Sequence, residues 1–552
     1  MSPSLSKMYG EMAEKRRPFL ERARDASKLT IPTLLPPEGH TNESEFLTPY
    51  QSIGSDGVNN LASAMLISLL PPQTPFFRFT IDKGEWMARR TAQIVEAAAQ
   101  ESGLDPALVD PAQFLQVAQQ EWDVNFASTD QELRMMENQV LREMETMTIR
   151  PPVDEALRHL FVAGNVLIHM PDTGGLRVFR LDRYVVERDP MGKLYRIITC
   201  ETVKVDQLPE EIRTEAIDQP DDQSVKHNEV NLYTQTVLED GSFKVHQEVG
   251  RGVLVPGSEG TVKEEDLPWM ALRFRRIDGE SYGRGLIEES QGDLESLEWL
   301  SMSIVKASVA SAKVLFMVKP TGRTRAKTIA RSQFGAVVEG DMDDVGTLQV
   351  NKAADMQVAF ATAQAIEGRL GRKFLKPENF IRDAERVTAE EIRRLAQAQE
   401  QNLGGFYSTL SEDFQLPLVR MLVRRMQKDG RLATMEEKLV SPTIVTGFAG
   451  LGRSIEMDAF DRVVGRINQM FGPEVAQMYL KPREAIDFIA AQEGIQVDAF
   501  LKSQEEVDQA QQAAQQAQAV EKLGPQVIKG ATEMSKLSAQ QQAEQQQQQE
   551  IA

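Results

Sequence analysis

Three aspartates close together in the chain are candidates for metal-assisted chemistry. Asp341, Asp343 and Asp344 lie within four residues, and paired carboxylates of this kind hold the metal ions of many nucleases. A nuclease site also needs distant partners, and no ExK motif or flanking histidine stands out. A solvated loop between two strands is the alternative interpretation, and it is the favoured one.

Two glycine-rich stretches are candidates for phosphate binding. They are GESYGRG at residues 279–285 and GLGRS at residues 450–454, and a helix start with free backbone N–H groups can hold a phosphate. Glycines that permit a turn or cap a helix explain the same residues and are the favoured interpretation. No GxxxxGKS or GxxxxGKT loop is present, which argues against an ATP-driven motor of the P-loop type.

Histidine and cysteine are too few for a Cys/His zinc site. The chain has five scattered histidines and one cysteine, Cys200, so neither a zinc spacing nor an internal disulfide is expected. His159 and His169 lie on or beside apolar segments and are interpreted as core or surface residues. The sequence therefore assigns no catalytic residue, no metal ligand and no cofactor.

Basic side chains gather in two segments. The denser cluster comprises Lys313, Lys319, Arg323, Arg325, Lys327 and Arg331. The second set comprises Lys373, Lys376, Arg382 and Arg386. The denser cluster is either an exposed loop without a partner or a contact site for phosphate or an acidic protein, and both readings stay open. The net charge of −20 argues against a protein that coats nucleic acid, because such affinity comes from cations that release counterions.

Length and hydropathy set the scale of the elements that position these residues. A chain of 552 residues exceeds one ordinary domain, and a hydrophobic fraction of 41% is normal for a globular protein. The longest apolar run, at residues 61–70, is about half of the roughly 20 residues that span a bilayer. The first residues lack the apolar core of a signal peptide. We therefore expect a protein of the cytosol or of a particle, with no membrane contact.

The N-terminal half is predicted to hold helices followed by a β region. Helical stretches are expected at residues 6–29, 57–70, 130–146 and 153–163, where apolar residues recur at helical spacing or a charged helix-prone run stops at prolines. Short β-branched runs then alternate with turn residues over 164–275, which predicts a mostly antiparallel β region. Asp240-Gly241 suits a tight hairpin turn between two of the strands.

The helical period returns at Gly285 for about thirty residues. One apolar stripe contains Leu286, Leu294, Leu297, Leu300, Ile304 and Val309. The acidic residues on other faces are Glu288, Glu289, Asp293, Glu295 and Glu298. A basic, turn-rich insert follows, which contains the denser basic cluster and whose flanks are predicted to be strands. A second helix, at residues 355–374, then runs back toward the start of the first. The sequence thus predicts two long helices joined by a small basic insert.

The last part of the chain is predicted to be a long helix, a further region and a polar tail. The helix begins near Val387, where Thr388 and Glu391 form a capping box. It is expected to kink or break near Gly404-Gly405 and Pro417. From residue 503 the chain is rich in Gln, Ala and Glu, a composition that cannot bury enough surface to fold compactly.

Several blocks of sequence together resemble one family. They include TIPTLLPPEG, GVNNLASAMLISLLPPQTPFFRFTI, LFVAGNVLIHMP, YVVERDPMGKL, RIDGESYGRGLIEESQGDLESLE, ERVTAEEIRRLAQAQEQNLGGFYSTLSEDFQLPLVRML and PTIVTGFAGLGR. In this order they resemble the head-to-tail connector, or portal, proteins of short-tailed, T7-like phages. The resemblance covers about residues 13–468 and leaves out the Gln-rich C-terminus. It is specific, because several long blocks match in the same order.

The resemblance implies an α+β, mainly α portal fold that forms a cyclic ring of about twelve subunits. Laid onto this chain, the family's regions are a wing (1–284), stem helix 1 (285–314), a clip (315–353), stem helix 2 (354–374), a tunnel loop (375–386), a long wing helix with its following segment (387–450), a helical crown (451–502) and a disordered tail (503–552). The residues that would then face DNA are Lys373, Lys376, Arg382 and Arg386. The denser cationic cluster would be a clip contact for a partner or DNA. The candidates for lining the channel would be Glu288, Glu289, Asp293 and Glu295.

The same resemblance implies a role and partners. The ring would sit at one capsid vertex of the virion after assembly in the host cytoplasm, and double-stranded DNA would pass through it without sequence-specific contacts. Major capsid and scaffolding proteins, the packaging terminase, tail adaptor and tail proteins, and internal core proteins would be its partners. Two alternatives remain: another structural virion protein, such as a tail adaptor or a scaffold that would lack the β region, and a packaging enzyme that would carry a nucleotide loop or nuclease carboxylates.

Overall fold

The computed structural model describes residues 3–40, 44–71, 75–102, 114–218, 228–312, 315–332, 337, 339–348, 353–374, 406–433, 440–444, 463–467, 469, 470, 472, 536 and 538. The chain divides into two compact units, Met1–Leu451 and Gly452–Ala552, and in the second only a few helical residues are described. The predicted tunnel loop, the capping box at Thr388 and Glu391, and nearly all of the predicted crown and tail lie outside the described residues.

Helices dominate the N-terminal part of the first unit. They are α1 (Leu5–Lys28), α2 (Ile53–Leu69), α3 (Lys83–Ser102), α4 (Leu115–Thr146) and α5 (Arg150–Ala163). Apolar side chains at helical spacing bury one face of α1, among them Leu5, Tyr9 and Met12. α5 ends at Gly164, whose positive φ of 72° suits glycine. The four predicted helices are confirmed, but α3 was not predicted and α4 begins well before Asp130.

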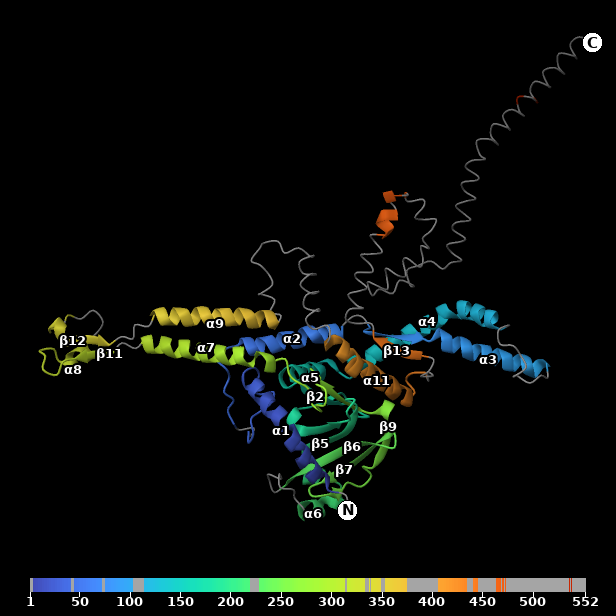
Figure 1. Ribbon diagram of the computed structural model, residues 1–552, viewed down its shortest axis with the longest axis horizontal. Helices are drawn as coiled ribbons and strands as arrows, with labels where there is room; N and C mark the ends of the chain where they lie inside the picture. Colours follow the sequence, from blue (N-terminus) through green and yellow to red (C-terminus); the bar gives the residue numbers. More distant parts are fainter. Residues whose placement is uncertain are drawn as a thin grey trace, which may run out of the picture. The chain divides into compact units, whose positions relative to one another are not determined.

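The β region contains two antiparallel sheets (Figure 1). The larger has six strands, β4 (Tyr184–Arg188), β5 (Leu194–Lys204), β6 (Glu229–Glu239), β7 (Ser242–Val249), β8 (Val253–Leu254) and β9 (Gly260–Lys263), in the order β4-β5-β6-β7-β8 with β9 also on β7. The smaller has the order β10-β2-β3, with β2 (Asn165–His169), β3 (Arg177–Phe179) and β10 (Trp269–Arg273). A short helix, α6 (Glu210–Asp218), lies between β5 and β6 in the chain. The predicted antiparallel β region is therefore confirmed.

The predicted hairpin at Asp240-Gly241 is present between β6 and β7. Asp240 has a φ of 51° and Gly241 a φ of 78°, so both central residues take the positive values of a type I′ turn. The strands pair in register from Glu239 opposite Ser242 to Leu232 opposite Val249. A two-residue pattern was enough to predict this turn because its geometry is local.

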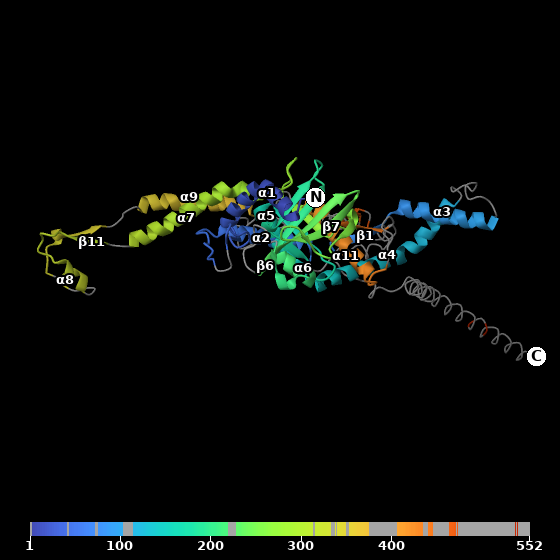
Figure 2. The same ribbon diagram turned by 90° about the horizontal axis from the view of Figure 1, so that it is seen from below.

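The two long helices joined by an insert are α7 (Gln291–Ala312) and α9 (Ala353–Lys373). Both views show them side by side (Figures 1 and 2), and side-chain contacts join residues 293 with 369 and 311 with 356, so the helices are antiparallel. α7 begins at Gln291 after a 3-10 turn, Glu288–Ser290, and not at Gly285 as predicted. Residues just before that turn pack against α5 instead: the backbone N–H of Ile287 donates to the carbonyl of Phe161 at 3.3 Å.

The C-terminal part of the first unit returns to the core. A π-helical turn, Ser411–Gln415, precedes α11 (Leu416–Lys428), and Pro417 stands in the first turn of α11. A break near Pro417 was predicted, and the π turn is the irregularity found there. Strand β13 (Val440–Ile444) pairs antiparallel with β1 (Phe77–Ile81), although neither strand was predicted.

One hydrophobic core joins these elements. Its buried side chains come from α2, β1, α4, α5, β2, β10, α7, α9 and α11 and from residues beside them, and they include Phe77, Phe161 and Phe374. At the contact of α2 with the end of α9, a Cβ on Gly57 would lie 2.5 Å from the ring of Phe374. The glycine lets the two backbones approach, so the base of the helix pair is fixed to the body of the unit.

Candidate functional site

The 3-10 turn before α7 and the first turns of α7 carry the predicted acidic residues, and cations of the same chain meet most of them. Glu288 accepts from Arg22 at 3.1 Å and from Arg284 at 2.9 Å. Glu289 pairs with Arg275 and, at 3.4 Å, with Lys373. Hydrogen bonds with Glu280 and then Glu288 raise the pKa of Arg284, so its charge is secure. These contacts tie α7 to α1, to the segment after β10 and to α9.

Two further acidic candidates lie on the first turns of α7. Asp293 accepts from Arg369 of α9 at 2.8 Å, and Glu295 accepts from the amide of Gln291 at 2.9 Å. Three of the four acidic candidates therefore have a cationic partner within the chain. A paired carboxylate repels a DNA duplex less than a free one, because the partner cation cancels most of its field beyond a few ångströms.

Lys373 is the described member of the predicted tunnel-loop set. It is the last residue of α9, and its ammonium lies 3.4 Å from the carboxylate of Glu289. Its position is therefore partly set by the helix pair. Lys376, Arg382 and Arg386 lie outside the described residues.

Exposed apolar side chains lie on both long helices. On α7 the predicted stripe begins buried at Leu294 and Leu297, but Val309 near its far end is exposed. Trp299 is 66% exposed, and Val358 on α9 is 69% exposed. Val305 and Phe360 are exposed as well. Large exposed apolar side chains on one pair of helices are typical of a surface that another chain covers.

The insert between the two helices is a small folded unit. β11 (Leu315–Val318) pairs antiparallel with β12 (Val345–Leu348), which confirms the predicted strands at its flanks. Between them lie α8 (Ala326–Arg331) and a 3-10 turn, Met342–Asp344. The carboxylate of Asp344 accepts from the backbone N–H groups of Arg323, at 2.7 Å, and Thr324, at 3.2 Å.

The aspartates weighed as a nuclease site hold this insert together. Asp341 accepts from the backbone N–H of Asp343 at 3.2 Å and so caps the 3-10 turn. Asp344 crosses to the opposite loop, where a Cβ on Gly322 would lie within 2.4 Å of its carboxylate. Among the described residues, no group of three His, Cys, Asp or Glu side chains is placed to hold a metal ion. The hydrogen bonds support the interpretation of these aspartates as part of a loop between two strands.

The basic cluster of the insert is exposed. Lys319, Arg323, Arg325, Lys327 and Arg331 are all solvent-exposed, and within the described part of the chain none has a carboxylate within ion-pair distance. Lys313 lies outside the described residues. Backbone groups and Asp344 make the hydrogen bonds that organise the described loop, and the charged groups of these five residues take no part in them.

The glycines of GESYGRG fit the structural reading and not a phosphate cradle. A Cβ on Gly285 would lie 2.6 Å from the carbonyl oxygen of Val162, and one on Gly283 would lie 2.8 Å from that of Arg275. Backbone atoms therefore fill the space beside Gly283 and Gly285, whereas Gly279 has open space and the positive φ, 75°, of a turn glycine. Asn165 also bonds Gly283 in both directions, at 2.7 and 2.9 Å. The second stretch, GLGRS, lies outside the described residues.

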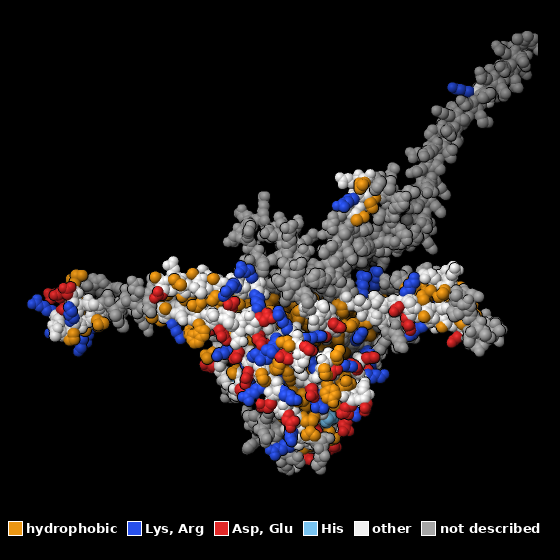
Figure 3. All heavy atoms as spheres, viewed as in Figure 1, with side chains coloured by type: hydrophobic (Ala, Val, Ile, Leu, Met, Phe, Trp, Pro, Cys, Tyr) orange, Lys and Arg blue, Asp and Glu red, His pale blue; other side chains and the backbone are white. Residues whose placement is uncertain are grey.

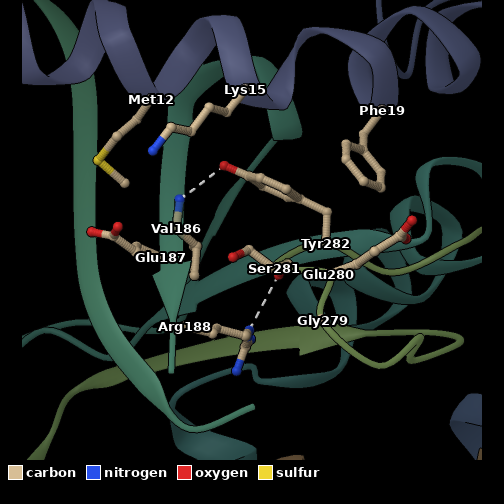
Figure 4. A pocket seen from close by; sticks show the side chains of 10 residues that line it. All are labelled: Met12, Lys15, Phe19, Val186, Glu187, Arg188, Gly279, Glu280, Ser281 and Tyr282. Carbon is tan, nitrogen blue, oxygen red and sulfur yellow. Dashed lines mark hydrogen bonds between the residues drawn. The ribbon is translucent and has the colours of Figure 1, made fainter. Parts of the chain in front are cut away.

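A cavity of about 280 Å³ lies where α1 crosses β4. Figure 4 shows the hydroxyl of Tyr282 directed at the backbone of Val186, and Arg188 directed at the carbonyl of Ser281. These contacts measure 2.9 and 3.2 Å. Among the described residues that line the cavity, Ser281 has no histidine beside it, and the acidic members are Glu187 and Glu280. Glu187 and Glu280 already pair with Arg196 and Arg284 of the same chain, so the two carboxylates of the lining are engaged within the fold.

The two histidines lie in the core region, as one of the sequence readings expected. His159 is buried on α5, where burial and then the nearby charge of Arg180 lower its pKa to about 3. His169 stacks on Trp269 at a ring distance of 4.0 Å, and burial lowers its pKa to about 4. Both are neutral near pH 7, and neither faces a nucleophile in the described structure. No helix of the described residues is long and apolar enough to cross a bilayer.

Exposed apolar side chains on the two long helices and the exposed basic cluster of the insert are features typical of a protein that assembles with other chains. The chain belongs to the family described as bacteriophage head to tail connecting protein, whose profile it matches over residues 2–501. It has the role of a head-to-tail connector.

Relatives with assigned names agree with this membership. The portal protein of Escherichia phage T7 is 36% identical over 464 residues, 83% of this chain and 80% of the relative. That of Enterobacteria phage T3 is 35% identical over 83% of this chain and 80% of the relative. That of Enterobacteria phage SP6 is 30% identical over 93% of this chain and 92% of the relative. A solved chain from the neck of a gene transfer agent particle aligns over 61% of this chain and 77% of its own, with 11% identity and a TM-score of 0.29.

Proposed function

We propose that this chain is a portal subunit, one of about twelve that form a ring at a single capsid vertex of the virion. The observation that carries the proposal is the family match over residues 2–501, together with relatives named portal protein that align over most of both chains. In this role the ring surrounds a channel through which double-stranded DNA is packaged and later ejected. It is a structural role, with no reaction assigned to the chain.

The surface of the helix pair supports assembly into a ring. Trp299, Val305 and Val309 on α7 and Val358 and Phe360 on α9 are exposed although they are apolar. Covering such residues with a neighbouring copy removes apolar area from water, at about 25 cal/mol per Å². A contact between different faces of identical chains either closes into a ring or grows into a filament. A closed ring, unlike a filament, surrounds a central channel.

The charge of the chain suits a channel through which DNA slides. A protein that neutralises many phosphates binds DNA strongly and with a steep salt dependence. This chain has a net charge of −20, and the acidic residues at the start of α7 are largely paired within the chain. Weak contacts from a few basic residues, with Lys376, Arg382 and Arg386 of residues 375–386 as candidates, would steady the duplex without reading its sequence.

The regional assignment and the partners are part of the same proposal. The N-terminal helices and the β region would form the wing, α7 and α9 the stem, and the insert the clip. The clip side would meet the packaging terminase and later the tail proteins, and the remaining partners would be capsid, scaffolding and internal core proteins. A scaffold is the less suitable alternative, because the chain contains a six-stranded antiparallel sheet where a scaffold is expected to be mostly helical.

Immunogold labelling of intact and tailless particles tests the location. Antibodies against the insert, or a peptide tag placed in it, should label one vertex per particle, and the label on tailed particles should be blocked or found only at the head–tail junction. A tag in residues 503–552, which the clip assignment leaves out, serves as the comparison. Label distributed over the whole shell, or along the tail, would overturn the proposal.

A further inference from the structure

The insert has two oppositely charged sides, and this carries an inference about how neighbouring copies meet. Its basic residues are Lys319, Arg323, Arg325, Lys327 and Arg331, and its acidic residues are Glu339, Asp341, Asp343 and Asp344. On the face that Figure 3 draws, acidic side chains gather at one edge of the insert, and basic side chains lie at its outer end and along the opposite edge. The separation leaves two surfaces of opposite sign on one small unit.

Most of these charges are not used within the described insert. The backbone of residues 323 and 324 holds Asp344, and Asp341 caps the 3-10 turn. Glu339 and Asp343 are exposed, as are Arg325 and Lys327, and none of the four has an ion-pair partner among the described residues. The unit therefore presents free cations and free carboxylates at the same time.

A DNA duplex matches only one of the two sides. Residues 313–352, which join the two helices, hold seven cations against four carboxylates, so a duplex would be attracted by the basic side and repelled by the acidic one. A purely acidic or purely basic protein would likewise meet one favourable and one unfavourable side. A second copy of the insert, placed head to tail, meets each side with its complement.

We infer that the inserts of neighbouring copies form an ionic seam, in which the basic side around Arg325 and Lys327 of one copy faces the acidic side around Glu339 and Asp343 of the next. This inference rests on the proposed ring, because only a repeated head-to-tail contact brings the two different sides together at every junction. The seam orients the inserts relative to one another through charge, and like-charged sides keep a wrong docking from forming.

Charge reversal with rescue in the full-length chain tests the seam. Arg325→Glu with Lys327→Glu places two carboxylates on the basic side, and Glu339→Lys with Asp343→Lys places two ammonium groups on the acidic side. Arg325 and Lys327 lie at the start of α8, where a carboxylate suits the helix dipole, so the first variant does not disfavour the helix. Asp341 and Asp344 stay unchanged because they hold the turn.

Each double variant should form fewer rings than the unmodified chain, with an association constant per junction about tenfold lower at low salt and a difference that shrinks as salt increases. The quadruple variant, in which both sides are exchanged, should recover the rings. An equal mixture of the two double variants should also recover them as alternating co-assemblies, visible as mixed masses in native mass spectrometry.

Two outcomes would overturn the seam. One is ring formation by both double variants equal to that of the unmodified chain at every salt concentration. The other is failure of the quadruple variant and of the mixture to recover. If Arg325→Glu with Lys327→Glu leaves the rings unchanged but lowers binding of a 30-base-pair duplex, the insert contacts DNA and the seam is refuted. Absence of rings from the unmodified chain would instead refute the proposed function itself.

Discussion

Asn165 and Gly283 form a reciprocal pair of hydrogen bonds across 118 residues of the chain. The side-chain oxygen of Asn165 accepts from the N–H of Gly283 at 2.7 Å, and its amide donates to the Gly283 carbonyl at 2.9 Å. Asn165 is 2% exposed and is the first residue of β2. The pair therefore fixes the segment that leads into α7 to the body of the unit.

Replacing Asn165 by Ala should lower the free energy of unfolding by about 2–3 kcal/mol, because both backbone groups of Gly283 lose a buried partner. Urea unfolding followed by circular dichroism measures the change. Asn60→Ala, at an exposed position of α2, is the matched control and should change stability by less than about 0.5 kcal/mol. Equal stability of the two variants would contradict the assigned role of Asn165.

Gly285→Ala should destabilise the chain by about 2–3 kcal/mol, because the new Cβ would lie 2.6 Å from the carbonyl oxygen of Val162 and the backbones would have to separate. Gly368→Ala is the opposite case. No atom lies within 4 Å of a Cβ at that position of α9, and alanine in a helix should add about 0.5–1 kcal/mol. The same unfolding measurement compares the two. A Gly285→Ala variant with unchanged free energy of unfolding would show that the close approach of the backbones at Gly285 and Val162 is not needed.

Stability should fall as the pH is lowered through the window below 6.5. His159 has a folded-state pKa of about 3, so between pH 6.5 and 3 the unfolded chain binds a proton that the folded chain does not. The free energy of unfolding then decreases on acidification, with a slope of up to about 1.4 kcal/mol per pH unit from this residue. His159→Leu, which cannot titrate, should flatten the curve between pH 6 and 4. A slope equal to that of the unmodified chain would contradict the assignment.

The tunnel-loop prediction now separates into two parts. Lys376→Ala, Arg382→Ala and Arg386→Ala together should leave ring formation intact and lower the amount of DNA packaged or retained, because each removes a salt-screened attraction to phosphates. Lys373→Ala is tested on its own, since Lys373 pairs with Glu289, and should act on the helix pair more than on DNA. Measuring the amount of DNA per particle across a range of salt concentrations tests both predictions. Packaging and retention equal to the unmodified protein would assign the triple set to a solvated loop.

Local patterns in the sequence predicted much of the fold. The Asp240-Gly241 hairpin follows from two adjacent residues with positive φ angles, and the helices α7 and α9 follow from their spacing of apolar residues. The strand pair β1 and β13 was missed. Its two strands are more than 350 residues apart in the chain, and nothing local links Phe77 to Ile444, its partner in the register. The alternation of apolar and polar residues in FRFTI, at residues 77–81, was the available signal, and Phe77 and Phe79 are the side chains that the strand buries.

The candidate site was predicted by residue type but not by contact. The acidic residues Glu288, Glu289 and Asp293 lie at or just before the start of α7, and their ion pairs with Arg22, Arg275 and Arg369 depend on how distant segments pack. The apolar stripe likewise could not show where it leaves the core between Leu297 and Val309. A single sequence shows the periodicity of apolar residues along a helix. Which side chains contact one another is decided by the tertiary fold.

The most direct test of the portal assignment is electron microscopy of the purified full-length protein, with native mass spectrometry of the same sample. We predict closed rings of about twelve copies around a central channel wide enough for a DNA duplex, with the helix pair of each copy covered by its neighbour. A stable monomer under assembly conditions, or an open filament without a channel, would contradict the account.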